Sequence, residues 1–430
     1  MTQPADIKAH AQHALSLTAE WIERFGPRLA GSAACRQAAE AVQQTLAEIC
    51  GTAHTETFET HPQAFLGFYQ INTLIYLFGL GMVWLHQALP AALAFSFIEL
   101  SALLEFGFYK EFYDRLFPRR TCANVWSSLE PRGKVLRQVI VSGHHDSAQE
   151  LRILRRWQKL YALRVMAPTF FDGIAIVLTW SWTVASLVGT HVTYIPFLQW
   201  FLVAGLLFVI PKCFLASPHG TPGAGDNLIA TAMLVQLAQM FADGQAAGQS
   251  WLAHTRLIFA SFDAEESALR GSRAFAHRHR AELQATPTLA LNIDSIYQAG
   301  ELQFLTSDLN DFQPLDAKVA AECREIAQAA GYPARLARMR FGGGATDATE
   351  LARAGVKATT MIAMSTQVVR DGLVYHTLND TVDAIEPAAV QACLSVADGF
   401  ICRQDGVPVP RDFASSIKIE TKIETKIETA

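Results

Sequence analysis

Two pairs of long apolar segments constrain this chain more than any other feature of its sequence. The first pair covers about residues 66–89 and 91–108, and the second covers about residues 170–189 and 193–215. Each segment approaches the ~20 residues that a helix needs to cross a bilayer. Because the linkers within the pairs are very short, each pair is expected to form a helical hairpin that begins and ends on the same side.

These segments also contain residues that disfavour a simple membrane helix. Glu99 and Glu105 lie in the second segment, Asp172 begins the third, and Pro196 interrupts the fourth. Carboxylates are costly inside a bilayer, so we expect them to face the interior of the bundle or to lie near an interface. An alternative stays open, in which the helices form a buried subdomain or a dimer interface of a water-soluble protein.

Composition favours a water-soluble body that carries a few membrane segments. Half of the 430 residues are hydrophobic, only 17% are charged, and the mean hydropathy is +0.17. These values lie between those of a soluble enzyme and those of a channel. The net charge of −5 gives no basic field for nucleic acid, so we expect no nucleic-acid partner.

Basic residues flank the hairpins and are missing from the hairpin tips. They are Lys110, Arg115, Arg119 and Arg120 after the first pair, Arg152, Arg155, Arg156, Lys159 and Arg164 before the second, and Lys212 at its end. By the positive-inside rule, the tips lie outside and the body lies in the cytoplasm. The first residues contain no apolar core of signal-peptide length, which agrees with a body in the cytoplasm. The expected location is therefore a membrane, crossed four times.

The cysteines point to a reducing compartment. They are Cys35, Cys50, Cys122, Cys213, Cys323, Cys393 and Cys402. They are odd in number, scattered, and show no C-x-x-C spacing. The pattern argues against a disulfide framework and against a cysteine zinc site.

Outside the hairpins the chain alternates strands and helices. Residues 135–142, 256–262, 288–293 and 356–363 are short aliphatic runs typical of buried strands, and residues 228–241 and 317–330 have helical patterns. This alternation predicts an α/β body with a mostly parallel central sheet and helices on both faces. We assign residues 1–64, 118–150 and 217–405 to this body, 65–117 and 151–216 to the inserted hairpins, and 406–430 to a low-complexity tail.

Acidic and histidine motifs follow the predicted strands, at the edge where α/β proteins place their active sites. The strand at 135–142 leads into His144 and Asp146, and the strand at 288–293 leads into Asp294. The strand at 256–262 leads into Glu265 and Glu266. Asp226 begins a predicted helix, and Tyr375 and His376 lie in a loop near the C-terminus. Histidine and carboxylate ligands favour zinc.

Spacing suggests individual roles within these motifs. Asp146 can hold the imidazole of His144 through its second nitrogen. Glu265 and Glu266 diverge as neighbours, so one can bind metal while the other acts as general base. Each motif alone has an ordinary alternative, such as a helix cap or a solvated charge. Their joint placement at strand ends favours a metal centre.

The chain closely resembles the co-catalytic zinc aminopeptidases of clan MH, the family of bacterial leucyl aminopeptidase and aminopeptidase Y. The resemblance rests on GPRLAGS at residue 26 and on the ordered motifs GHHDS, PGAGDN, FDAEESALRGSRAF, LNIDSI, GGATDATELARAGVKA and YHTLNDTVD. It covers most of the chain outside the hairpins and implies the zinc exopeptidase fold. One departure is Ala348, where relatives often carry histidine.

The resemblance implies a site with two zinc ions. Asp226 corresponds to the bridging carboxylate, with His144 and Asp294 completing one zinc site and Glu266 and His376 the other. The corresponding general base is Glu265, with Asp146 orienting His144 and Tyr375 helping to stabilise the oxyanion. The implied reaction is removal of N-terminal residues from peptides.

Other activities remain open at this point. A glutaminyl-cyclase-like enzyme with one zinc ion, a carboxypeptidase or deacylase of the same clan, and a non-catalytic membrane scaffold share parts of the pattern. Expected partners are peptide substrates and the lipid bilayer, together with a possible second copy of the chain.

Overall fold

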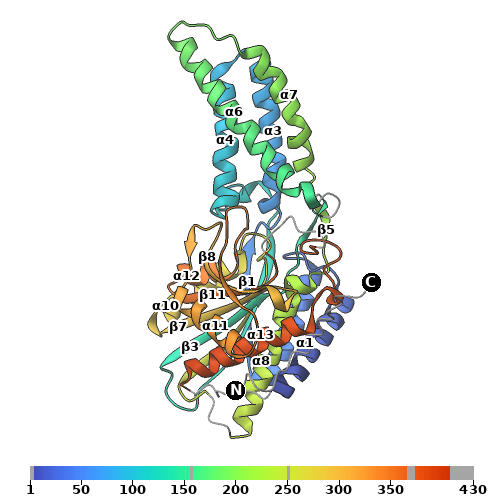
Figure 1. The fold of residues 1–430 in the computed structure, drawn as a ribbon, viewed down its shortest axis with the longest axis vertical. Coiled ribbons are helices and arrows are strands. Elements are labelled where there is room, and N and C mark those ends of the chain that lie inside the picture. Colours follow the sequence, from blue (N-terminus) through green and yellow to red (C-terminus); the bar gives the residue numbers. More distant parts are fainter. Residues whose placement is uncertain (1–3, 153, 155–157, 249–251, 366–372, 407–430) are drawn as a thin grey trace, which may run out of the picture.

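An α/β body and a bundle of four helices make up the molecule (Figure 1). The computed structural model describes residues 4–152, 154, 158–248, 252–365 and 373–406. The low-complexity tail expected at 406–430 lies outside the described residues, apart from its first residue.

A mixed sheet forms the centre of the body. Along the sheet the strands are β1 (Ala53–Thr60), β2 (Arg120–Leu129), β6 (Thr255–Phe262), β3 (Arg137–His144), β7 (Thr288–Ile296), β11 (Lys357–Ala363), β8 (Leu302–Asp308) and β10 (Arg335–Arg338), with β9 (Gln313–Pro314) paired to β8. The four central strands β6, β3, β7 and β11 are parallel, whereas β1, β2 and β9 pair antiparallel. The mostly parallel sheet predicted from the alternating pattern is therefore confirmed.

Helices cover both faces of this sheet. One face packs against α1 (Pro4–Phe25), α2 (Ala33–Cys50), α8 (Ile229–Ala246), α11 (Ala317–Ala329) and α13 (Pro387–Gln404). The other face packs against α9 (Arg270–Arg278), α10 (Arg280–Ala285) and α12 (Ala348–Arg353). Successive residues of β3 alternate between the two cores, with Val139 and Val141 in one and Ile140 in the other. This alternation follows from the two-residue repeat of a strand.

Two inserted hairpins form the projecting bundle. The first consists of α3 (Ala64–Trp84) and α4 (Ala88–Ala102), which continues as a π-helical turn over Leu103–Gly107. The second consists of α6 (Tyr161–Leu187) and α7 (Ile195–Lys212). Neighbouring pairs α3–α4, α4–α6, α6–α7 and α3–α7 are in contact, so the four helices close on themselves.

The observed helix ends differ from the sequence expectation in two places. Pro196 was expected to interrupt the fourth segment but occupies the first turn of α7, where its missing N–H costs no helical hydrogen bond. The third segment begins at Tyr161 rather than at about residue 170, and Pro168 lies within it. The local apolar pattern therefore located the helices but not their first turns.

The bundle is apolar on the inside and on the outside. Tyr76, Phe95 and Leu202 belong to its buried core, whereas Val177 is 66% exposed and Leu207 is 75% exposed. All four helices are long and apolar enough to cross a membrane. Glu99, Asp172 and Lys212 line one small cavity between the helices. Glu99 and Asp172 thus face the interior, as expected.

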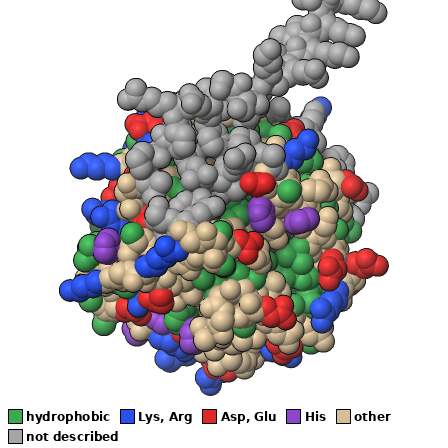
Figure 2. All heavy atoms as spheres, turned by 90° about the horizontal axis from the view of Figure 1, so that it is seen from below, with side chains coloured by type: hydrophobic (Ala, Val, Ile, Leu, Met, Phe, Trp, Pro, Cys, Tyr) green, Lys and Arg blue, Asp and Glu red, His purple; other side chains and the backbone are tan. Residues whose placement is uncertain are grey.

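The body has the charged surface of a water-exposed domain. Figure 2 views it from the end opposite the bundle, where acidic and basic side chains are interspersed. The apolar outer surface of the bundle contrasts with this face.

A buried ion-pair cluster fastens the first hairpin to the body. The guanidinium of Arg270 lies 2.9 Å from Asp114, 2.6 Å from Glu111 and 3.9 Å from Glu105. Arg270 is only 3% exposed and follows the loop that carries Glu265 and Glu266 closely in sequence. The returning end of the hairpin is therefore held against the loop that bears two of the predicted site residues.

The second hairpin joins the body through a short two-stranded sheet. Its neck pairs β4 (Gln149–Leu151) antiparallel with β5 (Ala216–Gly220). The backbone N–H of Leu151 also donates to the carbonyl oxygen of His376 at 2.9 Å. Both hairpins thus meet the body beside predicted site residues.

Candidate metal centre

The predicted ligands lie together at the carboxyl edge of the sheet. His144 ends β3, Asp294 lies near the end of β7, and Glu266 follows β6. Asp226 belongs to the turn Ala224–Leu228, where its backbone is not helical and which leads into α8, and His376 comes from the loop after β11. Five segments that are distant in sequence therefore converge, as expected where a parallel sheet delivers its strand ends.

The Asp226 carboxylate lies between the two histidines. Its Oδ1 is 3.4 Å from Nε2 of His144, and its Oδ2 is 3.0 Å from Nε2 of His376. Nε2 of His376 is also 3.2 Å from Oε2 of Glu266. One oxygen of the Asp226 carboxylate thus faces each histidine.

Donor atoms form two overlapping groups around His144. In one group, atoms of His144, Asp226 and Glu266 all lie within 4.8 Å of one another. In the other group, atoms of His144, Glu265 and Asp294 also lie within 4.8 Å of one another. Glu265 reaches His144 at 3.7 Å from Nε2, so the predicted base also lies within the cluster.

Asp146 holds both His144 and the glutamate loop. Its Oδ1 lies 3.2 Å from Nδ1 of His144, and its two oxygens accept the backbone N–H groups of Glu265 and Glu266, each at 3.2 Å. All these side chains are buried or nearly so. Asp146 is therefore positioned to fix the orientation of the imidazole, as the spacing predicted.

The buried charges perturb one another strongly. Burial would raise the pKa of Asp226, but its contacts with His144 and His376 outweigh burial and lower that pKa. Burial favours neutral His376, yet Glu266 and Asp226 raise its pKa to about 10. Burial raises the pKa of Glu266 to about 7. Such perturbation is typical of functional sites, where charge is concentrated in a low-dielectric environment.

These residues fit a zinc site. Nε2 of His144, Nε2 of His376, Oδ2 of Asp226 and Oε1 of Glu266 are buried, and none of them has a hydrogen-bond partner among the described residues. Unpaired buried polar atoms are costly, and a shared cation satisfies them. Imidazole nitrogen and carboxylate oxygen are ligands that zinc accepts.

Tyr375 lies beside the cluster. Its ring stacks on that of His376, with centroids 3.8 Å apart. Burial, followed by the charges of Asp226 and Glu266, holds the pKa of Tyr375 well above its usual value. Its hydroxyl therefore stays protonated and remains a possible hydrogen-bond donor.

Sequence reasoning gave no role to two residues that shape the Asp226 loop. Asp380 is buried, and its carboxylate accepts the backbone N–H groups of Gly225 at 2.8 Å and Asp226 at 3.3 Å. Arg28 is also buried, and it donates to the carbonyl oxygen of Gly223 at 2.9 Å. Both residues lie in quoted motifs, YHTLNDTVD and GPRLAGS. The motifs could have drawn attention to them, but their partners are distant in sequence.

An open cleft of about 390 Å³ leads from the cluster to the base of the hairpins. Glu266 and Ser147 line its inner end, and Gly67 and Phe214 line it beside the hairpins. Its basic residues are Arg120, Arg152 and Lys212. The cleft therefore runs along the junction between body and bundle, with carboxylates at one end and cations further out.

Comparison with known proteins identifies the region that carries most of these ligands. Residues 208–401 match the model of peptidase family M28. This region includes Asp226, Glu266, Asp294 and His376, while His144 lies before it. No curated protein sequence matches the chain.

Solved structures match nearly the whole chain. A zinc aminopeptidase from Bacillus subtilis is 15% identical, with a TM-score of 0.53, covering 92% of this chain and 95% of that one. A glutaminyl cyclase from Fimbriiglobus ruber is 13% identical, with a TM-score of 0.51, covering 93% of this chain and 94% of that one. A glutaminyl cyclase from Bacteroides thetaiotaomicron is 10% identical, with a TM-score of 0.53, covering 91% of this chain and 97% of that one. At these identities the likeness concerns the fold.

Proposed function

We propose that this chain, whose residues 208–401 match peptidase family M28, is a zinc-dependent aminopeptidase held at a membrane by its two hairpins. The observation that carries the proposal is the Asp226 carboxylate, whose two oxygens face His144 and His376 at 3.4 and 3.0 Å. In the proposed assignment, His144 and Asp294 would hold one zinc ion, Glu266 and His376 would hold the other, and Asp226 would be shared between them.

Zinc bound there would supply a Lewis acid that polarises the scissile carbonyl and acidifies water. The protein side chains supply the remaining functions. Glu265, beside His144, takes a proton from the attacking water and passes it to the leaving amine. Asp146 keeps the imidazole of His144 in one orientation, and Tyr375 donates a hydrogen bond to the developing oxyanion.

Charge distribution favours cleavage at the amino end of a peptide. In the proposed assignment two zinc ions would offset the charge of their ligands, and Glu265, which is not a ligand, would leave a carboxylate to attract the positively charged α-amino group of a substrate. The cations of the cleft, Arg120, Arg152 and Lys212, lie toward the hairpins. They complement acidic groups further along the peptide or its terminal carboxylate. A carboxypeptidase would instead need a cation beside the metal ligands.

The glutaminyl cyclase alternative is kept because two structures with this fold are cyclases. Hydrolysis is favoured by the presence of both histidines, each near a different oxygen of Asp226. A site for one zinc ion would not need this pairing. The two activities therefore differ in the number of metal ions as well as in their products.

The test is hydrolysis of a panel of aminoacyl p-nitroanilides by the zinc-loaded full chain in detergent. We expect release of p-nitroaniline, and we expect Glu265→Gln to lower kcat by about 10²- to 10⁴-fold because the general base is lost. Glu23→Gln, an exposed change on α1, is the matched control and should leave kcat unchanged.

A second substrate separates the rival activities. The same preparation is given a peptide that begins with glutamine, and loss of ammonia is followed by mass spectrometry. Cyclisation without hydrolysis of the panel, together with one bound zinc ion per chain, would replace the aminopeptidase proposal by the cyclase.

The proposed membrane anchor and its orientation are tested by labelling. Thr190 lies between α6 and α7 at the tip of the second hairpin, and Lys134 lies on the body. In intact cells an impermeant maleimide should label Thr190→Cys but not Lys134→Cys, and lysis should expose the latter. Extraction of the full chain from membranes by alkaline carbonate alone would contradict the anchor.

A further inference from the structure

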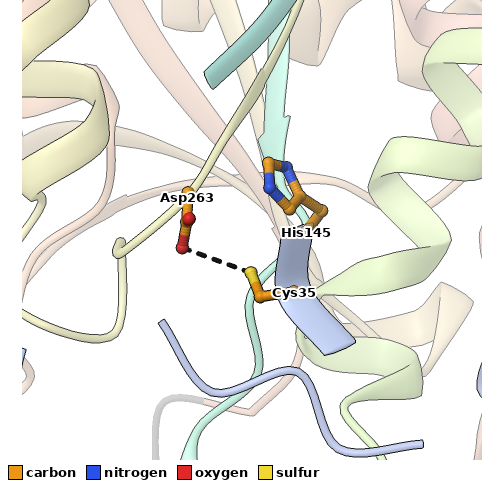
Figure 3. A group of neighbouring side chains, drawn as sticks. All are labelled: Cys35, His145 and Asp263. Carbon is orange, nitrogen blue, oxygen red and sulfur yellow. Dashed lines mark hydrogen bonds between the residues drawn. The ribbon is translucent and has the colours of Figure 1, made fainter. Parts of the chain in front are cut away.

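A second group of metal-binding side chains lies in the body, separate from the proposed zinc ligands. It consists of Cys35 in the first turn of α2, His145 just after β3, and Asp263 just after β6 (Figure 3). All three are fully buried. One ligand atom from each lies within 4.8 Å of the others, and Sγ of Cys35 is 3.2 Å from Oδ1 of Asp263.

His145 is prepared as a ligand. Its Nδ1 lies 2.9 Å from Oγ of Ser261, whereas its Nε2 is buried and has no hydrogen-bond partner among the described residues. The ring points toward the Cys35–Asp263 pair in Figure 3. A metal-binding histidine usually engages its second nitrogen in a hydrogen bond of this kind. Leaving the other nitrogen unpaired in the core is costly unless a ligand satisfies it.

A second thiol lies near the group. Cys122 on β2 is fully buried, and burial followed by the charge of Asp263 raises the pKa of its thiol. The other oxygen of Asp263, Oδ2, accepts the backbone N–H of Ala123 at 3.0 Å, which fixes the carboxylate. The structure brings three ligand atoms together; a turn of the Cys122 thiol toward them would supply the fourth ligand that a structural zinc site requires.

The surroundings supply the balancing charge. Arg28 is fully buried, and Cys35 is the strongest of the electrostatic contacts that favour its charged form. The hydrogen bonds of the guanidinium go to backbone carbonyl oxygens, including that of His145 at 2.8 Å. With two thiolates, one carboxylate and Zn²⁺, the group carries one negative charge, which this guanidinium offsets.

We propose that Cys35, Cys122, His145 and Asp263 form a further metal site that binds one structural Zn²⁺. The ion ties α2, β2, β3 and β6 together behind the strand ends that carry His144 and Glu265. Because all four side chains are buried, the ion enters during folding and is retained in the native protein.

Cobalt provides a probe that reports only this site. Thiolate ligands give cobalt(II) intense charge-transfer absorption in the near ultraviolet, whereas histidine and carboxylate ligands do not. The full chain, produced with cobalt in place of zinc, should show this absorption. The double variant Cys35→Ala/Cys122→Ala should lose the absorption and one metal ion per chain. Cys50→Ala, at the other end of α2, is the control and should keep both.

A second variant separates this site from the proposed catalytic centre. Asp226→Asn should lower peptidase activity and metal content while the thiolate absorption persists. Failure of the peptidase proposal would therefore leave this result unchanged. A folded parent protein that binds cobalt without thiolate absorption, or the same metal content in parent and double variant, would overturn the proposal and leave a hydrogen-bonded thiol cluster.

Discussion

Asp380 offers a sensitive test of how the proposed zinc site is positioned. Its carboxylate is buried and accepts the N–H groups of Gly225 at 2.8 Å and of Asp226 at 3.3 Å. Asp380→Asn keeps one acceptor oxygen but places an N–H₂ group against the second N–H. One hydrogen bond is lost, and two donors face each other.

The expected magnitude follows from that lost bond. A hydrogen bond to a charged group contributes about 1.5–3 kcal/mol, and about 1.4 kcal/mol corresponds to a tenfold change in Kd. If the loss falls on the bridging carboxylate, zinc binds about 10- to 100-fold more weakly. This range agrees with the cost of about 10- to 100-fold that changes behind metal ligands usually produce.

The assay is competition for zinc with a chromophoric chelator, performed on the full chain in detergent. Asp383→Asn is the matched control because Asp383 is exposed in the same segment. Asp383→Asn should bind zinc like the parent. An Asp380→Asn protein that is folded and binds zinc as tightly as the parent would refute the proposed positioning of Asp226.

Three further changes test other parts of the structure. Arg270→Met leaves the buried carboxylate of Asp114 without its cation and should destabilise the protein by about 3–5 kcal/mol. The measurement is thermal unfolding in detergent. An unchanged Tm would contradict the stabilising role of the ion pair between Arg270 and Asp114. Gly225→Ala places a methyl group against the ring of Tyr297 and should cost about 1–3 kcal/mol. Alanine at exposed Gly300, which has open space and no positive φ, serves as a comparison for local crowding. Removal of zinc by a chelator should lower the Tm and added zinc should restore it, and equal unfolding curves with and without zinc would argue against metal binding to the native state.

Local sequence patterns predicted most of the fold. Aliphatic runs located β3, β6, β7 and β11, and their order along the chain predicted a parallel sheet. The same patterns gave no signal for the antiparallel edge strand β1, whose burial is irregular and whose sequence is polar. Pairing with β2 determines that strand, and such long-range pairing is not encoded in a short window.

Four of the five proposed ligands could be predicted because each follows a strand or begins a helix, whereas His376 lies in a loop and was assigned by the family resemblance. His144 and Asp294 were expected at one edge for that reason, and the structure places them there; their roles remain predictions. Scattered cysteines, by contrast, argued against a cysteine metal site. Cys35 and Asp263 are far apart in sequence yet 3.2 Å apart in space, so spacing rules could not detect their contact.

The hairpins are inserted within the body rather than attached at one terminus. Their position limits how proteolysis can separate the body from the helical bundle and sets the order in which the parts are synthesised. A protease that cuts one hairpin tip leaves both fragments held in the same sheet, so a single cleavage cannot shed the catalytic body. Synthesis proceeds from the N-terminus, and Asp226, Glu266, Asp294 and His376 all follow the second hairpin. The last proposed ligands therefore leave the ribosome only after both hairpins have been made, so the proposed metal centre can form only once the helical bundle has been synthesised.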